Sequence, residues 1–180
     1  MSEQRQVALL RGINLARNKR IAMADLRAVV EGLGYGEVRT HLQSGNVVFK
    51  TADSPARAGR AIEGELDAKL GMEVRVLIRT DRELARVVER NPLGDLMTDP
   101  ARLLVTFLSA EPDAKRVRGI DPSEFEPDAF RIADREVYVW CPNGYAGTKL
   151  NHAFWEKQLG VTGTARNWRT VTRLLELARD

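Results

Sequence analysis

The sequence predicts an α+β fold made of two tandem ferredoxin-like βαββαβ halves with extra helices. The first observation is the order of patterns, because segments with strand periodicity and helix periodicity follow one another as β-α-β-β-α-β in the first half. The second is polarity. The first and third strand segments are apolar on both faces, whereas the second and fourth alternate, as expected if the strand order is fourth, first, third, second.

Local signals support each element of the first half. Ser54 and Pro55 are an N-cap and a first helical residue, and Gly71 ends the same helix. Thr80 and Glu83 have the spacing of a capping box that opens a further helix. The six segments expected are strand 7–10, helix 23–33, strand 38–43, strand 47–49, helix 55–70 and strand 74–79.

The second half repeats the order with weaker signals. The segments expected are strand 103–108, helix 113–120, a hairpin of strands 130–133 and 137–140, helix 150–159, strand 164–168 and a final helix from 171. Proline, glycine and aspartate cluster at residues 93–100, so the predicted halves are 1–98 and 99–180. The halves share no visible residue-level repeat, so duplication is inferred from topology alone.

Composition narrows the function classes. The longest apolar runs are about five or six residues, against the roughly 20 that a membrane helix needs. Cys141 is the only cysteine, which excludes an internal disulfide and fits the reducing cytoplasm. A formal charge of +3 and a pI near 9.2 are compatible with anionic ligands but do not require nucleic acid.

Two polar loops form the main candidate site. In the predicted topology, the loop after the first strand and the turn between the second and third strands lie at the same sheet edge. The residues expected to cluster there are Arg11, Gly12, Asn14, Lys19, Arg20, Ser44, Gly45 and Asn46. Glycine lets backbone N–H groups approach a ligand, and a helix start adds partial positive charge. The alternative reading is that these residues only make tight turns with a solvated surface.

A second group of candidates lies in the other half. The loop Gly144–Lys149 resembles a phosphate-cradling loop in type, but lacks the spacing of the P-loop. Lys149, Arg166 and Asn167 are therefore weaker ligand-binding candidates. Asn167 is also expected to cap the final helix, and Trp168 is expected in the core.

Other chemistries find little support. His41 and Ser44 are expected to point to opposite faces, and Cys141 is eleven residues from His152. The histidines and the cysteine give no metal-ligand spacing. Phe49 is the only aromatic residue on the first and third strands, so a base-stacking platform for RNA is not expected. Neither a catalytic residue nor a cofactor can be assigned.

Several motifs resemble one bacterial protein family, the domain of unknown function 1697. These are VALLRGIN at 7–14, MADL at 23–26, THLQSGNVVF at 40–49, GTKLN at 147–151 and TARNWRTV at 164–171. The matching residues are Arg11, Gly12, Asn14, Met23, Thr40, Gln43, Ser44, Gly45, Asn46, Lys149, Arg166, Asn167, Trp168 and Thr170. The resemblance implies a bacterial protein with two ferredoxin-like halves and brings no accepted enzymatic activity.

Two positions depart from the family pattern. The residues Leu15, Ala16, Arg17 and Asn18 replace a stretch that is often glycine-rich in the family, which weakens the phosphate-cradle idea. His41 stands where the family usually has an aromatic residue.

Three functions are therefore carried forward. The preferred one is binding of a small anionic ligand, such as a nucleotide or sugar phosphate, at the two loops. The alternatives are a nucleic-acid-associated protein and a non-catalytic interaction module, either monomeric or homodimeric. A cytoplasmic location is expected in each case.

Overall fold

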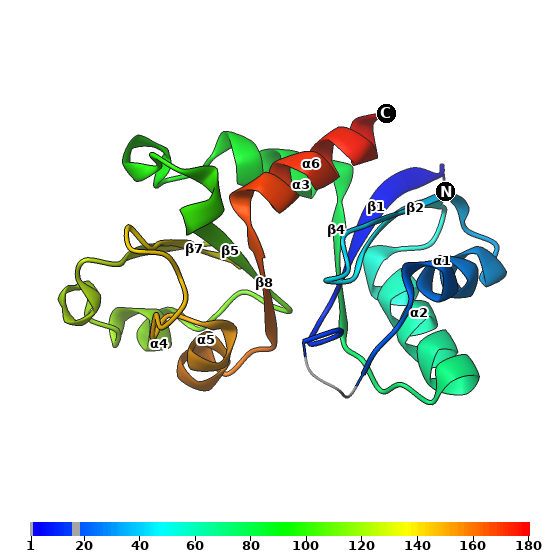
Figure 1. Cartoon of the computed structure of the whole chain (residues 1–180), viewed down its shortest axis with the longest axis horizontal. Helices are drawn as coiled ribbons and strands as arrows, with labels where there is room; N and C mark the ends of the chain where they lie inside the picture. The colour runs from blue at the N-terminus through cyan, green and yellow to red at the C-terminus, as the bar shows by residue number, and fades with distance from the viewer. Residues whose placement is uncertain (1, 16–18) are drawn as a thin grey trace. The chain divides into compact units, whose positions relative to one another are not determined.

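The computed structural model describes residues 2–15 and 19–180. These residues form two four-stranded antiparallel sheets, six α-helices and three short 3-10 helices (Figure 1), so the predicted α+β class is confirmed. The chain divides into two compact units. The first is Met1–Arg86 together with Arg173–Asp180, and the second is Val87–Thr172.

The first unit contains a sheet of strand order β2-β3-β1-β4, which is the order expected from the sequence of this half. Its elements are β1 (Gln4–Leu10), α1 (Met23–Gly32), β2 (Gly36–His41), β3 (Asn46–Thr51), α2 (Pro55–Leu70), β4 (Val76–Thr80) and the beginning of α3 (Asp81–Glu89). All three strand pairings are antiparallel. Figure 1 shows α1 and α2 on the same face of this sheet.

The predicted capping signals of this unit are present as hydrogen bonds. Ser54 Oγ accepts from the Arg57 N–H at 3.3 Å, and Gly71 ends α2 in the left-handed conformation. The Thr80 and Glu83 side chains each accept the other residue's backbone N–H, at 3.1 and 2.8 Å. The ends of α2 and the start of α3 are therefore fixed by local chemistry.

The helix-covered face of the first sheet carries the core of the unit. Ala8, Leu10, Val47 and Phe49 pack there with buried residues of α1 and α2. The ring of Phe49 stacks on Tyr35 with a centroid distance of 5.1 Å. Phe49 is thus a core residue on the helix side.

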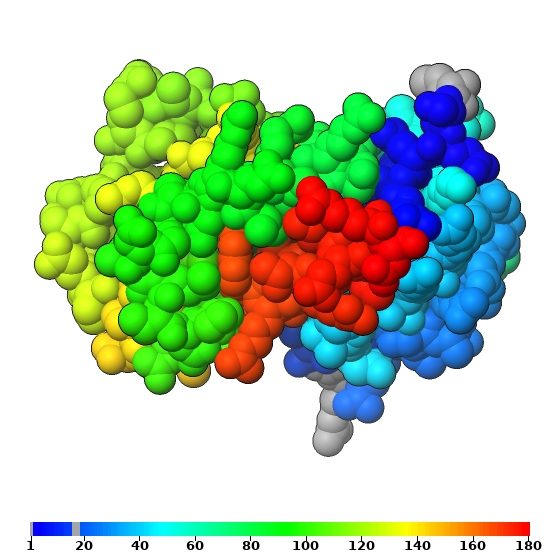
Figure 2. Space-filling model, turned by 90° about the horizontal axis from the view of Figure 1, so that it is seen from above, coloured from blue at the N-terminus to red at the C-terminus, as the bar shows by residue number. Residues whose placement is uncertain are grey.

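The opposite face of the sheet is also buried along its central strands. Val7, Leu9 and Val48 are at most 2% exposed. In the edge strand β4, the alternating polarity does not correspond to an exposed face, because Leu77 and Arg79 are both buried. The C-terminal residues of the same unit lie beside the start of the chain, as the red and blue surfaces in Figure 2 show.

The second unit has the equivalent strand order, β6-β7-β5-β8. Its elements are the 3-10 helices Gly94–Leu96, Pro100–Arg102 and Pro122–Phe125, with β5 (Leu103–Leu108), α4 (Ala114–Arg118), β6 (Ala129–Ala133), β7 (Glu136–Trp140), α5 (His152–Leu159), β8 (Gly163–Asn167) and the beginning of α6 (Trp168–Arg179). Its core joins one face of the sheet to α5 through Trp155 and Phe130, whose ring centroids are 5.0 Å apart. Trp168 begins α6 rather than ending the preceding strand, and it is buried, as expected. None of the helices in the described part of the chain is long and apolar enough to cross a membrane.

A glycine substitution in α2 tests how the helix is stabilised. Gly64 lies inside the helix, and a Cβ there would have no heavy atom within 4 Å. We expect Gly64→Ala to raise the free energy of unfolding by about 1 kcal/mol, measured by urea denaturation, because alanine is the better helix former. Gly59→Ala is the control. Its Cβ would lie 3.4 Å from Ile78 Cγ1 and from the Val76 carbonyl oxygen, so the added methyl group makes contacts that it lacks at Gly64, and the change in stability should differ. Equal effects of the two substitutions would contradict this account.

Candidate functional site

The two predicted loops meet at one edge of the first sheet. The Leu10 N–H donates to the Gly45 carbonyl at 2.9 Å, and Asn14 Nδ2 donates to the Gln43 carbonyl at 2.7 Å. Residues about thirty positions apart are therefore held together, because β1 and β3 are paired neighbours. We refer to the segments Arg11–Asn14 and Ser44–Asn46, with Lys19, as the loop cluster.

Asn14 is the residue that closes the first loop. Its backbone is left-handed, with φ of 55°. Its Oδ1 accepts from the Ile21 N–H at 3.0 Å, and its Nδ2 donates to the Ile21 carbonyl at 3.1 Å. The backbone N–H of Asn14 donates to the Lys19 carbonyl at 3.0 Å. The side chain thus joins both ends of the loop to the β2–β3 turn. Residues 16–18, which carry most of the departure from the family's glycine-rich stretch, lie outside the described residues.

Gly45 allows the turn to lie directly against the first loop. Its φ is +80°, and a Cβ at this position would stand 2.5 Å from Ile13 Cδ1 and 2.9 Å from Leu10 Cβ. Any side chain would therefore be strained and would also clash with the buried Ile13. Glycine at this position is explained by packing as well as by turn conformation.

Asn46 fixes the turn from inside. Its side chain is fully buried, and Nδ2 donates to the His41 carbonyl at 2.8 Å and to Ser44 Oγ at 2.9 Å. A buried amide needs such partners to offset its desolvation. Asn46 therefore positions Ser44 and the turn backbone, and it is not a surface group.

Backbone strain is concentrated in these loops. Among the described residues, five non-glycine positions have positive φ, and Asn14, Lys19 and Leu42 of this region are three of them. Leu42 has φ of 59° and is 55% exposed. A leucine in the left-handed region costs roughly 1–2 kcal/mol. Strain of this kind is found at ligand-binding and switch regions.

Two residues of the loop cluster, Arg11 and Lys19, are cationic, and Arg75 adjoins it. Lys19 Nζ donates to the Glu73 carbonyl at 2.8 Å, which places this ammonium group beside the segment that leads into β4. The Arg11 N–H donates to the Arg75 carbonyl at 2.9 Å, so the backbones of the two arginines are neighbours, and the Arg75 guanidinium lies 3.6 Å from the Glu63 carboxylate. Gly12, beside Arg11, is exposed, and its Cα has open space around it. Burial, and then the charge of Arg173, lower the pKa of His41, which favours the neutral ring.

The three candidates in the second unit have local structural roles or few contacts. Arg166 is buried and donates to Thr164 Oγ1 and to the Ala165 carbonyl, both at 2.8 Å. Burial lowers the pKa of Arg166 to about 10, so the guanidinium stays charged at neutral pH. Asn167 Oδ1 accepts from the Thr170 N–H at 2.9 Å, which confirms the predicted cap of α6. Lys149 is exposed and lies before α5, two residues ahead of its cap Asn151.

Cys141 does not have the surroundings of an activated nucleophile. Its thiol is buried, and burial followed by the charge of Asp128 raises its pKa to about 11. A reactive thiol needs a lowered pKa. Among the described residues, no group of three or more histidine, cysteine or acidic side chains has the arrangement of a metal site.

Replacement of Asn14 tests its role in closing the loop. Asn14→Ala removes three side-chain hydrogen bonds and a residue type suited to left-handed backbone. We expect a loss of about 2–3 kcal/mol in the free energy of unfolding, measured by chemical denaturation. Asn14→Gly keeps the backbone preference and should lose less. Gln43→Ala keeps the carbonyl that Asn14 uses and serves as the control; equal losses for Asn14→Ala and Gln43→Ala would refute the assignment.

Leu42 provides a test of the strain. We expect Leu42→Asn to raise the free energy of unfolding by up to about 1 kcal/mol, since asparagine tolerates positive φ. Leu42→Val should lower it, because a β-branched residue fits this conformation worst. Thermal and urea unfolding of the pair would measure the difference. Indistinguishable stabilities would mean that the turn relaxes around residue 42.

Comparisons with known proteins place the chain in a family. The family model described as "Protein of unknown function (DUF1697)" matches residues 4–138, which include the loop cluster but not Lys149, Arg166 or Asn167. No curated protein sequence matches the chain. The chain is similar in fold to conserved bacterial protein SP0830 from Streptococcus pneumoniae, with a TM-score of 0.77 and 20% identity over 98% of this chain and 99% of that one. More than half of the sequence thus matches one family model, and the chain belongs to the DUF1697 family of proteins of unknown function.

Proposed function

We propose that the chain binds a small anionic ligand, of the class of a nucleotide or a sugar phosphate, at the loop cluster. The observation that carries the proposal is the fixed left-handed geometry of both loops beside Arg11 and Lys19. A preorganised site avoids the entropic cost of ordering loops when a ligand binds.

Each residue has a defined part in this proposal. Arg11 and Lys19 supply charge, and an arginine can hold a phosphate through two parallel hydrogen bonds. Gly12 leaves room for an oxygen to approach the backbone. Ser44 orients the ligand, and Asn46 acts through the turn because its amide is bonded to His41 and Ser44. The extension of the site to Lys149, Arg166 and Asn167 stays a prediction, as do the two ferredoxin-like halves 1–98 and 99–180 and a cytoplasmic location.

Ligand screening tests the proposal. Wild type should be stabilised in thermal shift by nucleotides or sugar phosphates, and isothermal titration should show about tenfold weaker binding for Arg11→Ala, the loss expected for one charge-assisted contact. Lys19→Ala should weaken binding in the same direction. Arg60→Ala, which changes an exposed arginine of α2, is the matched control. Equal stabilisation of wild type and Arg11→Ala would exclude the loop cluster as the site.

A second function is favoured by two exposed leucines on the same loops. Leu15 is 74% exposed and Leu42 is 55% exposed, and each adjoins a residue of the Asn14–Gln43 hydrogen bond. Exposed apolar side chains on fixed loops suit a protein interface, including a homodimer. Sedimentation of wild type and Leu15→Ser with Leu42→Ser distinguishes the two functions, because only an interface would lose self-association. Salt-dependent binding of RNA or DNA by wild type would instead support the nucleic-acid alternative.

A further inference from the structure

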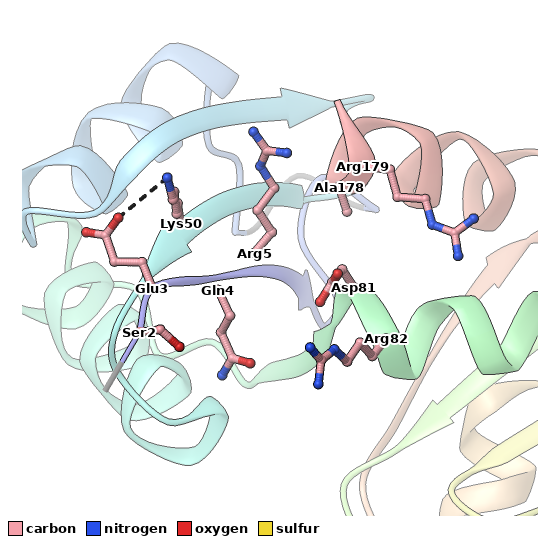
Figure 3. Close-up of a pocket in the computed structure, with 9 residues that line it drawn as sticks. All are labelled: Ser2, Glu3, Gln4, Arg5, Lys50, Asp81, Arg82, Ala178 and Arg179. Atoms are coloured by element: carbon pink, nitrogen blue, oxygen red, sulfur yellow. Dashed lines mark ion pairs between the residues drawn. The ribbon is translucent and has the colours of Figure 1, made fainter.

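A second cationic site lies at the other end of β1. A pocket of about 520 Å³ opens within the first unit (Figure 3). Its lining residues come from the start of the chain, β3, the start of α3 and the end of α6, and are Ser2, Glu3, Gln4, Arg5, Lys50, Asp81, Arg82, Ala178 and Arg179. Ala178 is the one apolar residue among these nine. We refer to this as the basic pocket.

The floor of the basic pocket contains an unusual pair of charges. Arg5 on β1 and Lys50 on β3 are directly opposite each other in the strand register. Like charges at opposed positions destabilise a sheet unless an anion lies between them. Glu37 of β2 supplies that anion, because its carboxylate pairs with the Arg5 guanidinium and lies 3.4 Å from Lys50 Nζ.

The backbone of Glu37 is strained. Its φ is 50°, and it lies where the β2–β3 register shifts between Gly36 and Arg39. The hydrogen bond from Arg5 lowers the pKa of the Glu37 carboxyl, so the group stays ionised. Arg5 and Lys50 therefore already hold carboxylate oxygens, which have the charge and geometry that a bound phosphate would present.

Further charge comes from two helices. Arg82 belongs to the first turn of α3 and Arg179 to the last turn of α6. Both are exposed, and both line the pocket with Lys50. The lining thus has four cationic side chains and two carboxylates, Glu3 and Asp81, and the Glu37 carboxylate lies between Arg5 and Lys50. The Glu3 carboxylate lies 3.6 Å from Lys50 Nζ, as the dashed line in Figure 3 marks. With Glu37 counted, four cationic side chains stand against three carboxylates, and this excess of one positive charge favours an anion.

We propose that the basic pocket binds a small molecule bearing a phosphate or pyrophosphate group, held by Lys50, Arg82 and Arg179. The volume falls within the range of small-molecule sites, about 300–1,000 Å³. Most such sites have a largely apolar lining, so the polar and charged lining here favours a charged ligand. Guanidinium groups suit phosphate because they donate in parallel to two oxygens. β1 has seven residues at about 3.4 Å each, which separates this pocket from the loop cluster by roughly 20 Å. The two sites are distinct, and neither proposal depends on the other.

Isothermal titration of the full chain with inorganic pyrophosphate tests the proposal at low salt and again at 150 mM salt. One saturable event is expected at the pocket, about tenfold weaker in Arg82→Ala and in Arg179→Ala. Arg60→Ala is the control for loss of a surface charge, and Arg11→Ala the control for the loop cluster. Glu3→Gln should bind about two- to fivefold more tightly, since it frees Lys50 of a competing carboxylate. Unchanged melting temperatures would show that the variants remain folded.

The remaining outcomes each reject the basic pocket. Equally weakened pyrophosphate binding in Arg82→Ala and Arg60→Ala would mean that pyrophosphate is attracted only by the general positive charge of the surface. Loss in Arg11→Ala alone would assign pyrophosphate to the loop cluster, and no binding at low salt would exclude the pocket without deciding the proposal for the loop cluster.

Discussion

The edge of the first sheet depends on the hydrogen bonds of one side chain. Asn14 joins Ile21 to Gln43, and so connects the segment that enters α1 to the turn between β2 and β3. The Leu10–Gly45 backbone bond and the close approach of Ile13 to Gly45 also hold the two loops together. Asparagine suits the position because it offers a donor and an acceptor and also tolerates positive φ.

This arrangement has an energetic consequence for the neighbouring residues. The turn bonded by Asn14 includes Leu42, which is left-handed although nothing in its side chain favours that state. The packing of Gly45 on Ile13 and the internal hydrogen bonds of Asn46 offset the cost. The geometry of the loop cluster is consequently set by the protein itself. A ligand would meet a formed surface and would not have to order the loops.

The sequence predicts the frame of this region better than its atomic details. The capping motifs at Ser54 and Thr80 are local signals, so their bonds could be predicted from spacing. The predicted topology was enough to place Arg11–Asn14 beside Ser44–Asn46. The atoms that Asn14 bonds depend on a loop conformation that spacing does not encode. The opposition of Arg5 and Lys50 depends on strand register, which a one-residue shift would change. The basic pocket could not be predicted for that reason.

Strain and charge coincide at both ends of β1. At one end, Asn14 and Leu42 have positive φ beside Arg11 and Lys19. At the other, Glu37 has positive φ at the register shift between Gly36 and Arg39, and its carboxylate pairs with Arg5 and Lys50. In the described part of the first unit, every left-handed residue other than glycine belongs to one of these two regions. Turn geometry accounts for Leu42 in the β2–β3 turn as it does for Asp134 in the β6–β7 hairpin, whereas Glu37 lies within a strand. No turn accounts for the positive φ of Glu37, and there the ion pairs with Arg5 and Lys50 stabilise the strained backbone.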